Sequence, residues 1–337
     1  VDGTNIILVL GEITGKYIIP DKVVQISDNA FQNQASMTGV YIPDTVKYIG
    51  DYAFDSCYSL TDVEFGKNVS LTSLGAGAFA KCLALKEITL PKVTTLGKGA
   101  EAKIGSATGV FSYCINLEKV TLSDDITTIC NNMFCYTLSL KSINIPKKIK
   151  TIGANAFNYS GITSVSIPNS EKLSIGVNTF TRSKLSSITF ETDEKTGKRF
   201  DVSFGSTPFA YTLLTEVVFP EGMKTLPSLS KVSTLTKVTI PSTVTAIPAN
   251  AFEYTGLTSV TLPEKLTTIG DYAFQFSALK EITVPDKVTT IGNNAFKGCA
   301  DLVTVKGMKG VTSLGDYAFM ADGTEKDGFK TSLTTVE

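Results

Sequence analysis

The chain has 337 residues, 42% of them hydrophobic, and a formal net charge of −1. It lacks the excess of lysine and arginine that a nucleic-acid-binding surface requires, and it has no apolar run of about 18 residues that would span a bilayer as a helix. Histidine and tryptophan are absent, which excludes Ser-His-Asp and Cys-His catalytic arrangements and most zinc sites.

A phenylalanine recurs along the chain, mostly at intervals of 22 or 23 residues. It stands at Phe31, Phe54, Phe79, Phe111, Phe134, Phe157, Phe180, Phe209, Phe252, Phe274, Phe296 and Phe319. A fixed period of this size indicates a solenoid, in which each repeat buries its apolar face against its neighbours. Residues 1–22 are irregular, and we predict that they form an N-terminal cap, because a terminal repeat has one face without a neighbour.

Each repeat begins with apolar residues at alternating places, as in Leu257, Val260 and Leu262, with Ser and Thr between them. This alternation predicts a β-strand. Proline follows at Pro263 and at the matching place of most other repeats. Because proline has no N–H to extend a ladder, we expect the strand to end there and the chain to turn.

A glycine then precedes Asp or Asn and an Ala-Phe pair, as in Gly50-Asp51 and Gly270-Asp271. We predict a left-handed conformation at the glycine and a helical turn that begins with the Asp as its N-cap. The alanine and phenylalanine should point inward and close the coil. The strands of successive repeats should then lie side by side in one parallel sheet.

Three segments lengthen the repeat, near residues 98–108, 191–206 and 320–332. The first is rich in Gly, Ala and Ser, and the other two carry mixed charges. We predict that all three are insertions on the rim of a single solenoid domain that covers residues 1–337.

The segment from Leu279 to Cys299 contains the pattern Leu-x-x-Ile-x-Val-Pro followed by Ile-Gly-x-x-Ala-Phe-x-x-Cys. This pattern resembles the repeat of the BspA-type bacterial leucine-rich repeat family, and the resemblance covers nearly the whole chain. We therefore expect an α/β solenoid, a right-handed leucine-rich repeat superhelix of about thirteen turns of 22–23 residues, with its parallel β-sheet on the concave face.

The strand residues between the inward apolar ones should face outward, which brings Asp62 and Glu64 of one strand beside Glu87 of the next. Glu118 and Lys119 continue this charged section. A solvated acidic patch offset by Lys86 is the simplest interpretation, and weak cation binding or glycoside cleavage by a carboxylate pair are the alternatives. We predict no catalytic, cofactor or metal site and take Asp62, Glu64, Glu87, Glu118 and Lys119 as candidates for partner binding.

Four of the six cysteines (Cys57, Cys82, Cys114 and Cys299) stand three residues after a repeat phenylalanine. An even number of cysteines in a surface protein suggests disulfides. Other repeats hold serine at the same place, for example Ser160 and Ser183, so the place requires only a small side chain. We therefore predict buried, free thiols.

The resemblance implies a cell-surface or secreted protein that binds other proteins, in adhesion to host tissue or to other bacteria. We expect a monomer that is not an enzyme, needs no cofactor, does not bind nucleic acid and has no membrane-spanning segment. We expect it to hold a protein ligand on the concave sheet or the rim loops. A carbohydrate-binding surface protein and a passive spacer of a larger surface protein are the alternatives.

Overall fold

The structure is a computed structural model that describes residues 4–6, 8–98, 108–320 and 334–336. Contacts divide the chain into two compact units, Val1–Lys184 and Leu185–Glu337. The insertions predicted near 98–108 and 320–332 lie almost wholly outside the described residues.

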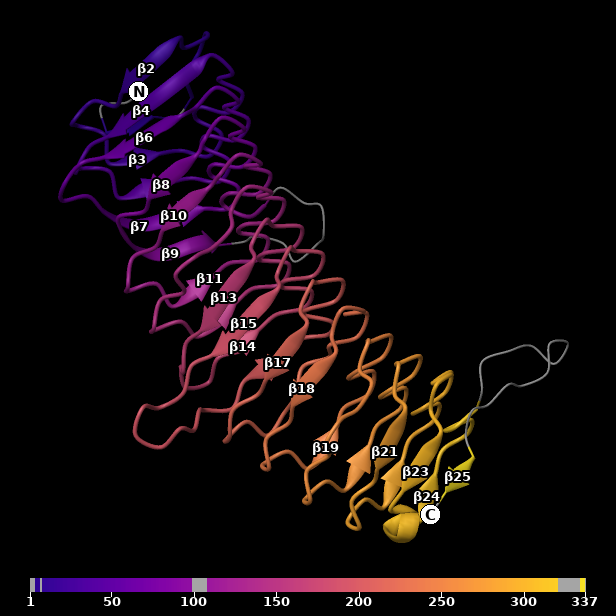
Figure 1. Ribbon diagram of the computed structural model, residues 1–337. Helices are drawn as coiled ribbons and strands as arrows, with labels where there is room; N and C mark the ends of the chain where they lie inside the picture. Colours follow the sequence, from indigo (N-terminus) through magenta and orange to yellow (C-terminus); the bar gives the residue numbers. More distant parts are fainter. Residues whose placement is uncertain (1–3, 7, 99–107, 321–333, 337) are drawn as a thin grey trace, which may run out of the picture. The chain divides into compact units, whose positions relative to one another are not determined.

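The first unit contains two rows of parallel strands, which Figure 1 shows in indigo to magenta. The first row consists of β2 (Gly15–Ile18), β4 (Met37–Ile42), β6 (Asp62–Phe65), β8 (Glu87–Thr89), β10 (Lys119–Thr121) and β13 (Ser164–Ile167). The second row consists of β1 (Asn5–Ile6), β3 (Gln25–Ile26), β5 (Tyr48–Ile49), β7 (Ser70–Gly75), β9 (Lys92–Lys98), β11 (Thr128–Ile129), β12 (Thr151–Ile152) and β14 (Ser174–Ile175).

Hydrogen bonds join β2-β4-β6 and β8 with β10 in the first row, and β1-β3-β5-β7-β9 and β11-β12-β14 in the second. The strand registers pair equivalent residues of successive turns, for example Ile26 with Ile49 and Val40 with Val63. The sequence predicted one sheet, and the second row corrects this. It forms where the second apolar residue of each turn, such as Ile49, points into the core.

The second unit repeats this arrangement, drawn in orange to yellow in Figure 1. Its first row consists of β15 (Ser187–Phe190), β17 (Glu216–Val218), β18 (Lys237–Thr239), β21 (Glu281–Thr283), β23 (Thr304–Lys306) and β25 (Thr335–Val336). Its second row consists of β16 (Ser203–Phe204), β19 (Ala246–Ile247), β20 (Thr268–Ile269), β22 (Thr290–Ile291) and β24 (Ser313–Leu314). The chain is thus a parallel-strand β-solenoid of about thirteen turns.

The α part of the predicted α/β architecture is not confirmed. Within the described ranges the only helical segment is the 3-10 helix η1 (Met308–Gly310). At the Ala-Phe pairs the backbone N–H groups donate to the next turn instead: Phe157 N to Thr179 O at 2.8 Å and Tyr159 N to Thr181 O at 3.1 Å. A helix would need these groups for bonds within the segment.

The glycine before Asp51 serves a different purpose from the one predicted. Gly50 has no left-handed φ, and a Cβ built on it would lie 2.4 Å from Asp28 Oδ1 and 2.5 Å from Asp28 N of the preceding turn. The position requires the absence of a side chain. The left-handed residue is Tyr52, two places further on, with φ 55°.

The repeat phenylalanines form the core of each unit, as predicted. In the first unit the rings from Phe31 to Phe180 stack at centroid distances of 4.9–5.9 Å. In the second, Phe252, Phe274, Phe296 and Phe319 stack at 5.1–5.3 Å. Tyr17 of the irregular first turn packs edge-on against Phe31 at 5.4 Å and so covers the end of the stack.

The insertion at residues 191–206 is only partly the exposed charged excursion that its composition suggests. Asp193 accepts hydrogen bonds from the backbone N–H groups of Lys195 and Thr196 and forms an exposed turn. Arg199 is buried over the ring of Phe190, 5.3 Å from its centroid, and its Nη1 donates to Glu191 O. Burial lowers the pKa of Arg199 to about 10.

Candidate functional site

The outward face of the first row in the first unit carries the predicted site residues. In a strand alternate side chains point to opposite faces, so Asp62 and Glu64 of β6 point outward and Val63 points toward the core. Parallel pairing then arranges these side chains in columns. Lys16 of β2 lies opposite Gly39 of β4, and Gly39 lies opposite Asp62.

Lys16 links the two carboxylates that the sequence placed together. Its Nζ lies 2.9 Å from Asp62 Oδ2 and 2.7 Å from Glu64 Oε2, although β4 separates the two strands. The lysine can cross β4 because Gly39 has no side chain: a Cβ there would lie 3.1 Å from Lys16 Cγ. Hydrogen bonds to Glu64 and Asp62 raise the pKa of Lys16 to about 12. The pair is therefore an ion-paired group and not an isolated acidic patch.

Glu87 and Lys119 face each other on adjacent strands. Their Cα atoms are register partners in the pairing of β8 with β10. Together with Asp62 and Glu64 they line one open depression of about 760 Å³, which Lys67 and Lys92 also border. The structure thus brings four of the five predicted residues to one surface.

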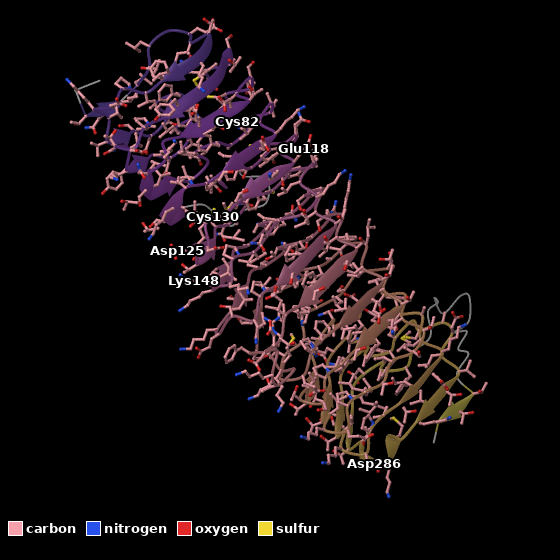
Figure 2. All side chains as sticks on the ribbon, turned by 60° about the vertical axis from the view of Figure 1, so that its left-hand side comes forward. Cys82, Glu118, Asp125, Cys130, Lys148 and Asp286 are labelled. Atoms are coloured by element: carbon pink, nitrogen blue, oxygen red, sulfur yellow. The ribbon has the colours of Figure 1, made fainter. Side chains whose placement is uncertain are left out.

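Glu118 is the fifth predicted residue and does not line this depression. It precedes β10, is exposed, and its backbone N–H donates to Lys86 O at 2.7 Å. Figure 2 places Glu118 on one long edge of the first unit and Asp125 and Lys148 on the other. On that other edge Asp125 pairs with Lys148 at 2.7 Å and with Lys92 at 3.6 Å, and these hydrogen bonds and charges lower the pKa of Asp125.

The outward columns beyond β10 are small and polar. In the first unit Ser164 and Ser166 of β13 are exposed. In the second unit a depression of about 900 Å³ lies over Thr239, Ser259 and Thr261, with Lys237 at its border. Lys237 pairs with Glu216 of the neighbouring strand at 2.6 Å. The second depression is also bordered by Glu221, Glu264 and Lys265.

The geometry offers little to acid–base or metal chemistry. A glycosidase needs one carboxyl group that stays protonated beside one that is ionised, whereas Asp62 and Glu64 both accept from the Lys16 ammonium group. Among the residues that the structure describes, no group of three or more His, Cys, Asp or Glu side chains is arranged to hold a metal ion.

Two features of the surface escaped the sequence analysis. The first is Lys16, whose partners lie 46 and 48 residues away; a glycine in the middle of a strand, Gly39, is the sequence signal for a close crossing. The second is a stack of Tyr113, Tyr136 and Tyr159. Each stands two residues after a repeat phenylalanine, so the same spacing rule that found the core would have found it.

The described ranges contain one short helical segment, η1. Within them no helix has the length and apolar character needed to span a bilayer.

The solved structures that resemble this chain include three bacterial proteins. A leucine-rich repeat protein of Bacteroides ovatus has a TM-score of 0.70 and 24% identity, over 93% of this chain and 82% of its own. A leucine rich cell surface protein of Faecalibacterium prausnitzii has a TM-score of 0.56 and 23% identity, over 99% and 95%. The pneumococcal vaccine antigen PcpA has a TM-score of 0.50 and 17% identity, over 93% and 78%. These likenesses concern the fold.

No curated protein gives a significant match. The model of the BspA type leucine rich repeat region matches residues 14–106, 103–228 and 202–325, which is most of the chain. These matches include the repeat phenylalanines and all strands of both rows except β1 and β25. The chain belongs to the BspA-type leucine-rich repeat family.

Proposed function

We propose that this chain is a binding scaffold of a bacterial surface or secreted protein, and that it holds a protein partner along the outward face of its first row of strands. The observation that carries the proposal is the open, ordered face itself. Its depressions lie over the strands and are lined by outward polar side chains, whereas small ligands prefer enclosed apolar cavities. A broad face of this kind suits a macromolecule.

The charged section of the first unit is the part we assign to partner recognition. Exposed charges act mainly on the rate and specificity of association. Because Lys16 already pairs with Asp62 and Glu64, Glu87 and Lys119 are the charges best placed to direct a partner. We assign Glu118 to the adjoining edge of the same unit.

The family supports the location and the absence of catalysis that we propose. BspA-type repeat proteins are typically binding scaffolds of the bacterial surface, and the similar Faecalibacterium protein is described as a cell surface protein. Adhesion to host tissue or to other bacteria follows from this as our proposal. We also retain the single right-handed domain with a concave first row, the monomer and the lack of a cofactor as predictions.

The first test is binding of the purified chain to a panel of extracellular-matrix proteins and to a glycan array. We expect binding to a matrix protein that becomes about tenfold weaker when Asp62, Glu64 and Glu87 are replaced together by Ser, with an unchanged circular dichroism spectrum. Replacing Asp125 and Lys148 by Ser on the other edge is the matched control and should change nothing. Lys16→Ser removes the ion pairs but keeps the carboxylates of Asp62 and Glu64, so it distinguishes the effect of the ion pairs from that of the acidic charges.

Two outcomes would contradict this proposal. Binding confined to glycans would favour the carbohydrate-binding alternative. Cleavage of a glycan or an ester that is lost in the triple variant would show that the carboxylates are catalytic.

A further inference from the structure

Tyr113 stands five residues before Glu118 and begins an unusual run of tyrosines in the turns of the first unit. Tyr113, Tyr136 and Tyr159 have left-handed backbones, with φ of 63°, 60° and 54°. This conformation suits Gly and Asn and disfavours bulky residues, and the same place in other turns is held by Asn33 and Gly298. The backbone therefore does not account for the choice of tyrosine.

The three rings lie parallel and in contact. Their centroids are 4.6 Å apart in both pairs, with interplanar angles of 7° and 8°. Arg182 continues the stack: its Cζ lies 5.4 Å from the centre of the Tyr159 ring, and its Nη1 donates to Tyr159 Oη at 2.6 Å. Because the faces cover one another, the half-exposed rings offer edges and hydroxyl groups. A sugar platform would need an open ring face instead.

In the turn of Tyr159 the place four residues after the core phenylalanine holds Gly161, and in the four turns before it that place holds large apolar or aromatic side chains. They are Tyr58, Leu83, Ile115 and Leu138, of which Tyr58 and Leu138 are 45% and 49% exposed. Backbone hydrogen bonds hold these places of successive turns together: the N–H group of Ala84, which follows Leu83, donates to Tyr58 O, and that of Ser139, which follows Leu138, donates to Ile115 O. We call the surface formed by Tyr113, Tyr136, Tyr159, Ile115 and Leu138 the tyrosine rim.

The charges along the tyrosine rim are mainly positive. Cationic side chains on the same turns are Lys81, Lys86, Lys141 and Arg182, all exposed or half-exposed. In the eight residues that start at each core phenylalanine from Phe54 to Phe180, the acidic residues are Glu118, which is exposed, and Asp55, which is buried and lies 3.6 Å from Lys81 Nζ. The acidic residues Asp62, Glu64 and Glu87 of the same turns belong to the first-row face. Tyrosine, arginine and aliphatic side chains with few carboxylates are also the composition of protein–protein interface cores.

We propose that the tyrosine rim is a second interaction surface, and that it binds a polypeptide segment whose apolar side chains are flanked by carboxylates. Apolar side chains of the partner pack on Ile115, Leu138 and the ring edges. Its carboxylates pair with the surrounding lysines and with Arg182, and the tyrosine hydroxyl groups donate to its polar groups. This surface is separate from the first-row face, so the triple substitution of Asp62, Glu64 and Glu87 leaves it intact.

The test uses a random copolymer of glutamate and tyrosine as the probe. Titration of the whole chain should show binding that weakens as salt is added, because exposed charges are screened. Polyglutamate, which lacks the apolar groups, should bind more weakly than the copolymer. Leu138→Ser, which keeps the ring stack, and Tyr136→Asn, which suits a left-handed backbone, should each weaken copolymer binding about tenfold.

Tyr254→Asn is the matched control. Tyr254 has the same left-handed backbone, φ 54°, and stacks on Phe276 at 4.8 Å. In its turn Glu253 precedes the tyrosine and Gly256 stands where Leu138 stands in the tyrosine rim. This variant should bind the copolymer as the unsubstituted chain does.

Any of four results would overturn the proposal. The first is equal binding of the copolymer by the unsubstituted chain and by Leu138→Ser and Tyr136→Asn. The second is binding of heparin without the copolymer, which would indicate an anionic glycan. The third is binding only to phosphatidylglycerol vesicles, which would indicate a lipid surface. The fourth is self-association in sedimentation that Leu138→Ser abolishes, which would make a second copy the occupant.

Discussion

Phe157 lies in the middle of the phenylalanine stack of the first unit. Its ring centroid is 5.3 Å from that of Phe134 and 5.1 Å from that of Phe180, and it is fully buried. Phe157→Ala should leave a cavity that backbone pairing on both sides keeps open, and should lower the free energy of unfolding by about 3–5 kcal/mol. Chemical denaturation of the two proteins measures this difference.

Phe319 is the comparison residue, because its ring stacks on Phe296 at 5.1 Å and remains half-exposed. Phe319→Ala should destabilise the chain less than Phe157→Ala. Phe31 is a poor comparison although it stands early in the chain, since Tyr17 packs on its outer side at 5.4 Å. Equal losses at residues 157 and 319 would contradict a core built from stacked neighbours.

The cysteines that follow the core phenylalanines act as hydrogen-bond donors. Cys57 Sγ donates to Phe31 O of the preceding turn at 3.2 Å, and Cys299 Sγ donates to Phe274 O at 3.1 Å. Ser183 at the same place donates to Phe180 O of its own turn at 2.7 Å. A small donor of either kind satisfies the position, so we expect melting temperature to be the same with and without a thiol reductant. A fall of many degrees with reductant would indicate disulfides.

Burial makes the stability of this protein sensitive to alkaline pH. It raises the pKa of Cys57 and Cys130 to about 12 and that of Cys299 to about 11, from 9.0 in the absence of burial. The folded state then binds more protons than the unfolded state above pH 9, so stability is fully present below that pH and declines as pH rises toward 12.

Cys57→Ser combined with Cys299→Ser should make this decline less steep, because serine does not ionise in that range. Urea unfolding between pH 8 and about 11 compares the two proteins. Identical slopes would mean that the thiols titrate alike in the folded and unfolded states.

The turn before each Ala-Phe pair shows why an element can be misassigned from its sequence. Gly50-Asp51 fits the start of a helix, since Asp is a good N-cap. In the structure Asp51 Oδ1 accepts from Ala76 N at 2.8 Å, and Asp51 N donates to Asp28 Oδ1 at 2.8 Å. The carboxylate thus caps the next turn of the solenoid, 25 residues away. The local sequence does not show whether the Asp51 carboxylate accepts from an N–H group of its own turn or from one of the next turn.

Asp51→Ala should remove the acceptor of the Ala76 N–H and destabilise the chain by about 1 kcal/mol. Asp51→Asn should retain the bond, because Asn293 in the equivalent place accepts from Asp316 N at 2.8 Å. Thermal unfolding of both variants measures the difference. If the two variants lost the same stability, the side-chain acceptor would be irrelevant.

The sequence predicted part of the candidate site, namely the part that depends on residues near one another in the chain. Strand alternation placed Asp62, Glu64 and Glu87 on one face, because it depends only on residues near one another in the chain. Lys16 reaches Asp62 across Gly39, and Glu118 lies away from the depression. Both depend on how distant turns stack: Gly39 signals a close crossing of β4, but a single turn does not show which side chain crosses there.

At the scale of the whole molecule, stability in each unit should follow position. Repeats of a solenoid contact only their neighbours, so terminal turns lose half of their packing and open first. In the first unit β1 and β2 are the outermost strands of their sheets, and in the second β24 and β25 are. Native-state hydrogen exchange should therefore be faster at these strands than at β12 or β20.

The variant Phe157→Ala extends this prediction. Because each turn contacts only its neighbours, the cavity should lower the local stability most in the turns that border it. Amide protection should fall chiefly at β12, which belongs to the turn of the substituted ring, and at β11 and β14, which belong to the turns on either side. Protection at β20 and β22 in the second unit should change little. A uniform fall across both units would mean that the chain unfolds as one cooperative block, and would contradict a stability that is summed turn by turn.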